Sequence, residues 1–171
     1  MSKTQLKKEI KNISRDQLEQ MILEAYDARK EIKQYFDFFL NPDVDKLTER
    51  YTLEINKEFS RSKRGYSKAR ITNVRRLYKE FKSYHPGFDK EIELLMHIIR
   101  VSLKSERVFN LSETMIRGIG SLLNELVNIS DKNLVADKVW SDLTTLLDDT
   151  AAGTRYFRKY LREQLESYRP T

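Results

Sequence analysis

The sequence predicts an all-α protein of a single domain, residues 1–171, and three observations support this fold class. Charged residues make up 34% of the chain, hydrophobic residues only 39%, and there are just 5 glycines and 3 prolines. Abundant charge with few turn residues is typical of helices that keep one face in water, whereas sandwiches and barrels need many more turns. Apolar residues also recur at spacings of three and four along most of the chain, which is the helical period. We therefore expect six to eight helices.

The N-terminal part predicts a short helix and then a long one. Residues 1–13 are expected to form a loosely attached N-terminal helix. Ser14 and Gln17 form a capping-box pair, and apolar residues follow at helical spacing as far as Phe39, which predicts one helix of about six turns. Asn41 and Pro42 suit the N-cap and the first position of the next helix, so the long helix should end before them.

The middle of the chain predicts two helices, over about residues 43–59 and 68–84, with Gly65 as a breaker and Ser67 as the cap of the second. The turn at residues 85–87, which reads HPG, ends that helix because proline cannot continue it. The segment Glu91–Leu103 is apolar on most of its circumference, which predicts a central helix covered by its neighbours.

The C-terminal part predicts three more helices, the first introduced by a capping box of Asn110 and Glu113 and the others near residues 134–147 and 154–168. Centres of alternate helices lie roughly 40 to 45 residues apart, within the range of HEAT-like helical pairs. No sequence signature recurs at that period. A compact multi-helix bundle and a short HEAT-like helical-repeat array therefore both remain open.

The chain has no cysteine, which excludes disulfides, thiolate chemistry and cysteine-based zinc sites. The N-terminus has no apolar core after its lysines, so it is not a secretory signal. The most apolar stretch is too short to span a bilayer. We expect a cytoplasmic protein without a membrane partner.

Positive charge is concentrated in one segment. The chain has a net charge of +6, but residues 57–82 hold ten basic and two acidic residues, so this segment carries +8 and the rest −2. Lysine and arginine neutralise phosphates and release counterions, which makes the segment a candidate polyanion-binding surface. The alternative is a solvated helix face that pairs with carboxylates of the same molecule. The candidate residues, four of them on one helix face, are Arg61, Lys63, Arg64, Lys68, Arg75, Arg76, Lys79 and Lys82.

Four stretches of the sequence resemble a known family. They are SKTQLKKEI, YFDFFLNP, KRGYSKARITNVRRLYKEFKSYHPG and LLDDTAAGTRYFRKYLREQLESY. Together they resemble a family of small, uncharacterised bacterial helical proteins, catalogued as a domain of unknown function. The resemblance covers essentially the whole chain and implies a helical fold and a bacterial cytoplasm. It implies no activity, cofactor or partner.

The DDT triplet, Asp148 to Thr150, has two interpretations. Its carboxylates could bind a divalent cation, although such sites need more oxygen ligands. The favoured interpretation is that an Asp or Thr caps the last helix, or that an Asp pairs with Arg155 or Arg158.

The histidines and one aromatic residue complete the candidates. His97 is interpreted as a core residue with one satisfied nitrogen, and His85 lies in a turn. Phe38 falls off the main apolar stripe of its helix, so it either packs against a second layer of helices or forms a tentative partner contact.

These observations predict a non-catalytic helical protein that binds a protein partner. The alternative is RNA or DNA binding through residues 57–82. An enzyme is not expected, because no acid–base pair or phosphate-binding glycine loop is visible. No cofactor or metal site is predicted, and the oligomeric state is left open.

Overall fold

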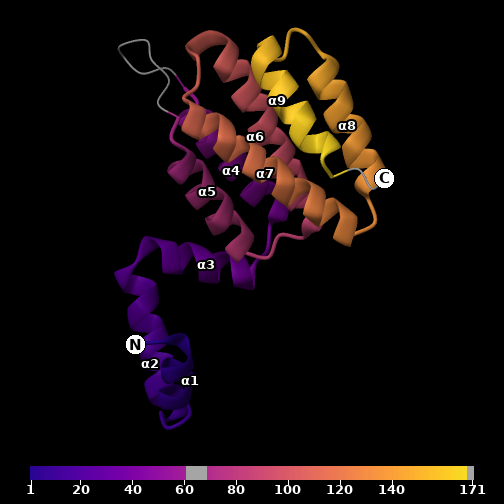
Figure 1. The fold of residues 1–171 in the computed structure, drawn as a ribbon. Coiled ribbons are helices and arrows are strands. Elements are labelled where there is room, and N and C mark those ends of the chain that lie inside the picture. The colour runs from indigo at the N-terminus through magenta and orange to yellow at the C-terminus, as the bar shows by residue number, and fades with distance from the viewer. Residues whose placement is uncertain (61–68, 169–171) are drawn as a thin grey trace. The chain divides into compact units, whose positions relative to one another are not determined.

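The computed structural model describes residues 1–60 and 69–168, and this part of the chain is all-α, as predicted. It contains nine helices, one more than the upper end of the expected range. The chain divides into two compact units, Met1–Asp43 and Val44–Thr171 (Figure 1). Each unit is treated by itself below.

The first unit contains α1 (Lys3–Ile10), α2 (Arg15–Ala28) and α3 (Lys30–Leu40). The predicted capping box at the start of α2 is confirmed. The Ser14 hydroxyl accepts from the backbone N–H of Gln17, and the Gln17 side chain accepts from the backbone N–H of Ser14. The expected single long helix is wrong, since the backbone at Arg29 is extended (φ −140°, ψ 121°) and separates α2 from α3.

The break at Arg29 lets α3 pack against α2. The Tyr26 hydroxyl donates to Asp37 Oδ1 at 2.8 Å, and the rings of Tyr26 and Phe36 lie 6.5 Å apart. Tyr26 and Asp37 are eleven residues apart, so in a continuous helix they would be about 16 Å apart along the axis. Side-chain contacts across the bend therefore replace the backbone bonds that a continuous helix would have made.

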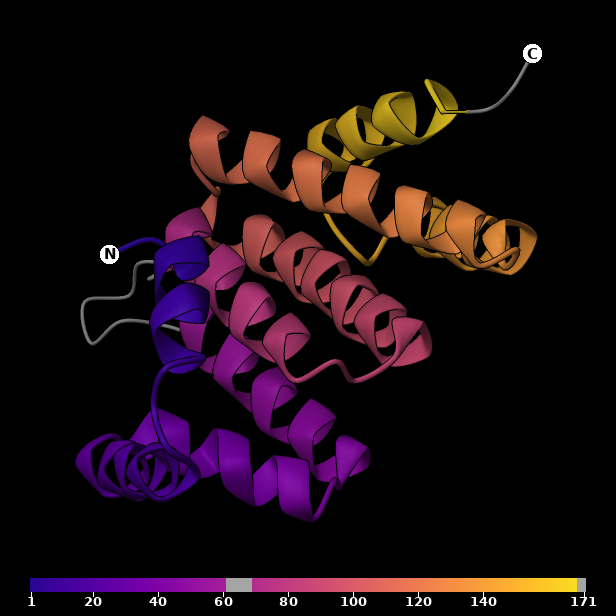
Figure 2. The same cartoon turned by 90° about the horizontal axis from the view of Figure 1, so that it is seen from below.

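The second unit contains three consecutive helix pairs. They are α4 (Val44–Glu58) with α5 (Ile71–Ser83), α6 (Phe88–Phe109) with α7 (Glu113–Lys132), and α8 (Ala136–Asp148) with α9 (Arg155–Glu166). The α6–α7 pair lies in the middle, with α4 against α6, α5 against α7, and α9 against α7 (Figures 1 and 2). Consecutive pairs thus stack on one another.

Helix α6 lies at the centre of this unit, as its apolar circumference predicted. Five of its apolar side chains have no exposed surface, and its partner α7 contributes a similar set. These apolar residues are Leu94, Leu95, Ile98, Ile99 and Leu103, and Ser102 is fully buried as well. Burial on several sides of one helix requires neighbours on several sides, so α6 organises the packing of the others.

Two glycines in α7 allow its neighbours to approach closely. A Cβ atom at Gly118 would lie 2.2 Å from Ile71 Cγ1 of α5, and one at Gly120 would lie 2.7 Å from the Tyr160 hydroxyl of α9. Because these glycines have no side chain, α5 and α9 can both pack against the backbone of α7.

Several predicted helix starts differ from the observed ones. The N-cap of α7 is Ser112, whose hydroxyl accepts from Met115 N, while Asn110 has a positive φ of 52° and ends α6. The predicted Asn110–Glu113 capping box is therefore wrong. Asn41 ends α3, and α4 begins at Val44, so Pro42 does not occupy its first position. Gly65 and Ser67 lie outside the described residues.

The expected helix stop at residues 85–87 is confirmed. Helix α5 ends at Ser83, and α6 begins at Phe88. His85 and Gly87 both have positive φ values, 53° and 98°, a conformation that glycine adopts at little cost.

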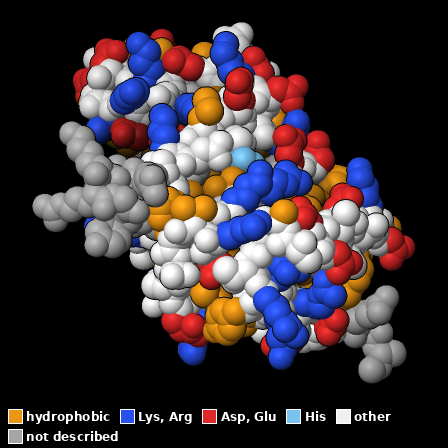
Figure 3. Space-filling view, turned by 90° about the horizontal axis from the view of Figure 1, so that it is seen from above, with side chains coloured by type: hydrophobic (Ala, Val, Ile, Leu, Met, Phe, Trp, Pro, Cys, Tyr) orange, Lys and Arg blue, Asp and Glu red, His pale blue; other side chains and the backbone are white. Residues whose placement is uncertain are grey.

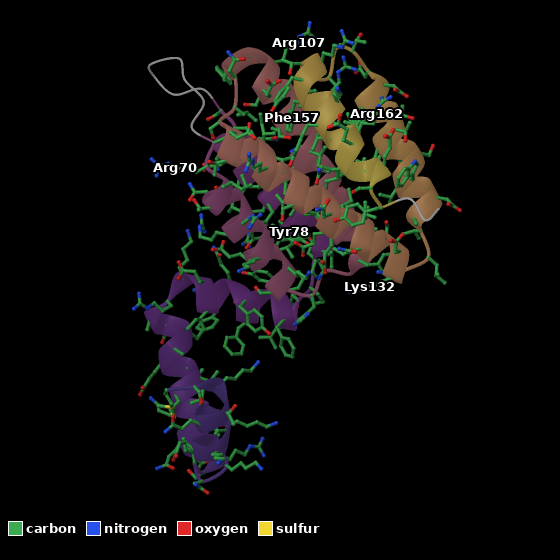
Figure 4. All side chains as sticks on the ribbon, in the orientation of Figure 1. Arg70, Tyr78, Arg107, Lys132, Phe157 and Arg162 are labelled. Atoms are coloured by element: carbon green, nitrogen blue, oxygen red, sulfur yellow. The ribbon has the colours of Figure 1, made fainter. Side chains whose placement is uncertain are left out.

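The loop between α8 and α9 is held against the end of α6 (Figure 4). Arg107 Nη1 donates to the carbonyl of Ala151 at 2.8 Å, and the buried Glu106 carboxylate accepts from Thr154 N at 3.3 Å. From α9, Arg158 donates to the carbonyls of Leu147 and Gly153 at 3.1 and 3.3 Å. The loop's backbone groups are therefore bonded to side chains on both neighbouring helices.

Gly153 of that loop packs against the buried Leu103 of α6. A Cβ atom there would lie 2.9 Å from Leu103 Cδ2 and 3.2 Å from the Leu103 carbonyl oxygen. Leu103 has no exposed surface, so it has little room to move away.

We expect Gly153→Ala to lower the free energy of unfolding by about 1–3 kcal/mol, because overpacking displaces a buried neighbour. Urea denaturation followed by circular dichroism measures the change. The matched control is Thr150→Ala in the same loop, where the side chain is exposed and a change of less than about 0.5 kcal/mol is expected. Equal stability of the Gly153→Ala variant and the native protein would contradict the tight contact.

Candidate binding surfaces

The structure describes half of the candidate polyanion-binding residues. Arg61, Lys63, Arg64 and Lys68 lie outside the described residues. The other four are all exposed on α5; they are Arg75, Arg76, Lys79 and Lys82. Figure 3 shows Lys and Arg side chains next to Asp and Glu side chains over much of the visible face.

Two of these four cations pair with carboxylates. Arg76 Nη1 lies 2.6 Å from Glu80 Oε1 one turn along α5. Lys82 Nζ lies 3.0 Å from Glu125 of α7 and 3.5 Å from Glu91 of α6. The hydrogen bond to Glu125 raises the pKa of Lys82. Lys82 therefore links three helices, and its charge is compensated within the molecule.

Arg75 and Lys79 form no ion pair with the residues that the structure describes. Arg75 lines a shallow groove of about 400 Å³ at the first turns of α5 and α7, opposite Arg117. Arg117 Nε donates to Glu113 at 2.9 Å, so that cation is also paired. The described basic face thus reduces to two uncompensated charges one helical turn apart.

A tyrosine belongs to the buried side of this helix. Tyr78, which is labelled in Figure 4, is buried, and its hydroxyl donates to Glu91 Oε2 at 3.2 Å. Burial and the carboxylates of Glu125 and Glu91 raise the pKa of Tyr78. Tyr84 lies half-buried beside Arg50 and Tyr51. Because Tyr78 is covered by protein, it cannot stack on a base.

The aromatic residues of α3 are distributed differently from the expected pattern. Phe38, expected off the main stripe, is half-buried, whereas Phe39, expected on the buried stripe, is 69% exposed. Leu40 is equally exposed. The two most exposed large apolar side chains of α3 are therefore its last two residues, while Tyr35 is 39% exposed.

The Asp148–Thr150 triplet does not cap α9. Thr154 caps it, since its hydroxyl accepts from Phe157 N. Asp148 pairs with Arg162, one turn beyond the expected Arg158, and Asp149 Oδ1 accepts from Ala151 N at 2.8 Å within the loop. Among the described residues no group of three or more His, Asp and Glu residues could hold a metal ion.

A groove lies between α6 and α8 in the second unit, and no sequence pattern indicated it. Its volume is about 700 Å³. It exists because α8 packs on α7 and α9 and not along α6. The apolar side chains in its lining come from both helices; they are Phe88, Ile92, Met96, Val135, Val139 and Leu146. No pattern within either helix indicates a space between two helices that lie about 45 residues apart.

The same groove has a charged rim with an excess of carboxylates. Arg100 and Lys138 are its cations, and the acidic residues in its lining are Asp89, Glu93, Asp142 and Asp149. Glu93 also accepts from Lys90 Nζ at 3.0 Å. The rim therefore has a net charge of −2 in a chain whose net charge is +6.

His97 lies on α6 and contacts α4. Its Nε2 is 2.8 Å from Asn56 Oδ1, and the side chain is half-buried. Burial lowers the pKa of His97, and the charges of Arg100 and Lys104 lower it further. The interpretation of one satisfied nitrogen agrees with this geometry, although the residue lies at the edge of the core.

Comparison with known families gives one match. A family model described as a family of unknown function, DUF6155, matches residues 1–165. The chain belongs to the DUF6155 family. The match covers both units of the structure. No curated protein and no solved structure matches the chain.

This DUF6155 protein has no helix, within the part that the structure describes, that is long and apolar enough to cross a membrane. That finding agrees with the short apolar stretches of the sequence.

The lowered pKa of His97 predicts that stability decreases in mild acid. The unfolded histidine binds a proton near pH 6.5, while the folded one resists it, so the free energy of unfolding should fall as pH drops from about 7 to about 5. Urea unfolding at several pH values measures this slope, and His97→Gln should have a shallower one. An NMR titration midpoint of His97 at or above 6.5 would contradict the prediction.

Proposed function

We propose that this protein is a non-catalytic helical interaction module that binds a helix of a protein partner in the α6–α8 groove. The observation that supports this proposal is the groove itself, with apolar residues from two helices along its lining and charges at its rim. Amphipathic helices bind such grooves by placing their apolar face inside.

The apolar lining supplies the driving force for binding. Phe88 is partly exposed at the start of α6, and Ile92 and Leu146 are half-buried. Covering such side chains gains about 25 cal/mol for each Å² of apolar surface removed from water. A partner helix would remove this surface from water along most of the length of α8.

The rim indicates the chemistry of the partner. Four carboxylates against two cations favour a helix with basic residues on the flanks of its apolar face. Charge complementarity of this kind increases association rates and orients the partner, more than it increases affinity. The net positive charge of the chain is located elsewhere and is screened beyond about 8 Å at physiological salt.

The groove proposal predicts that a bulky cation inside it blocks the partner. In Thr145→Arg the new side chain enters the groove, and we expect affinity for the partner to fall at least about tenfold, which corresponds to about 1.4 kcal/mol. A photo-crosslinking residue at position 146 captures the partner in cells, and calorimetry with the purified partner measures the affinity.

Ser141→Arg is the matched control, because Ser141 is exposed on the same helix but does not line the groove. It should bind like the native protein. Equal binding by the Thr145→Arg and Ser141→Arg variants would exclude the groove as the partner site.

A second candidate function is RNA or DNA binding through residues 57–82. The observation that favours it is the pair of exposed cations Arg75 and Lys79, which have no carboxylate partner among the described residues. The pairing of Arg76 and Lys82 weighs against it, because each of those charges already has an internal partner.

Nucleic-acid binding predicts steep salt dependence. Fluorescence anisotropy with a generic labelled oligonucleotide should show binding that weakens as salt rises from about 50 to about 200 mM, with log affinity linear in log salt. Arg75→Glu with Lys79→Glu should abolish binding at every salt concentration in this range. Lys132→Glu with Lys159→Glu changes the net charge equally at other sites and should retain most of the affinity. No binding at low salt would exclude this function.

A further inference from the structure

The N-terminal unit has no buried residue of its own. The structure describes all of residues 1–43, and none of them is buried. Large apolar side chains are exposed on all three helices; they are Leu6, Ile10, Met21, Ile22, Leu23, Phe39 and Leu40. Such a concentration of exposed apolar side chains marks an interaction surface.

A unit of this size needs a partner to cover that surface. A domain of about 60 residues buries only about 60% of the surface that its unfolded chain exposes, and Met1–Asp43 is shorter still. This unit has no cysteine. Its helices α2 and α3 pack against each other as a single layer. Helix bundles bury their apolar faces in a core shared between facing helices, so a second helix pair would supply the face that α2 and α3 lack.

The charges of the unit are complementary to a second copy of itself. Residues 1–43 contain eight basic and eight acidic residues. The basic ones are concentrated around α1, where Lys3, Lys7, Lys8 and Lys11 outnumber Glu9, and the acidic ones on α2, where Asp16, Glu19, Glu24 and Asp27 outnumber Arg15. Two copies can therefore meet without a net repulsion.

Helix α1 is available for such a contact because it packs along neither α2 nor α3. In a two-fold dimer, the same patch of each copy contacts the other, so every favourable pair occurs twice. Placing the basic α1 of one copy on the acidic α2 of the other forms both contacts at once.

We propose that residues 1–43 form a homodimerisation element, in which the α2–α3 pairs of two copies cover each other's apolar faces and α1 of each copy lies on α2 of the other. This surface is separate from the α6–α8 groove. The partner is a second copy of this chain.

The mass of the full-length protein in solution tests the proposal. Light scattering coupled to size-exclusion chromatography should give twice the 20.4 kDa of one chain. Leu23→Glu should shift the protein to the monomer, with a dimer dissociation constant raised at least about tenfold. Its matched control is Leu53→Glu on α4, because both leucines are 52% exposed, and this variant should remain dimeric.

A charge-exchange experiment tests the contact between α1 and α2. Lys7→Glu with Lys8→Glu makes α1 acidic, and Glu19→Lys with Glu24→Lys makes α2 basic. Each double variant should dimerise more weakly than the native chain. Mixing the two should restore the dimer as a heterodimer, because opposite charges then face each other at both contacts. A contact between α1 and α2 within one chain would not be restored by mixing.

Three outcomes would overturn the proposal. One is a native protein that stays monomeric up to the highest soluble concentration. That result would mean that the rest of the chain or a different protein, and not a second copy, covers the surface. Another is a Leu23→Glu variant that remains dimeric while its helical circular dichroism matches the native protein. The third is a mixture of charge variants that stays monomeric. Thr145→Arg should leave the dimer intact, so failure of the groove proposal and failure of this one are distinguishable.

Discussion

Burial of α6 is the constraint on which the second unit depends. Five of its apolar side chains have no contact with solvent, and a helix covered on so many sides needs several neighbours. Helices α4, α7 and α9 supply them, and α7 in turn carries α5 and α8. The two glycines of α7 allow α5 and α9 to come close enough to complete this core. The order of helix pairs follows from the need to enclose α6 and α7.

The end of α6 also holds the loop between α8 and α9 in place. Backbone groups of this loop form hydrogen bonds with the side chains of Arg107, Glu106 and Arg158. Gly153 lies against the buried Leu103. Buried backbone groups must find hydrogen-bond partners, and here charged side chains at the helix ends provide them. The acidic triplet in this segment is thus part of a structural connection, with Asp148 bound by Arg162.

The distribution of charge separates the two candidate functions. On α5, carboxylates from the same helix and from its neighbours compensate Arg76 and Lys82, which leaves Arg75 and Lys79 as the described cations of that face. The α6–α8 groove combines apolar area with a carboxylate-rich rim, and apolar burial contributes more to association than isolated surface charges. These two observations favour a protein partner over a nucleic acid.

The sequence by itself determined the helical class, the central place of α6 and most helix positions, because apolar period and proline or glycine stops are local signals. It could not determine the break at Arg29, where no breaker residue stands and contacts of Tyr26 with α3 decide the bend. It also could not show which cations of residues 57–82 have partners, since Glu91 and Glu125 come from distant helices. The groove, likewise, depends on the packing of α8 against α7 and α9. Such features arise only when segments far apart in the chain meet, and tertiary structure alone decides which of them do.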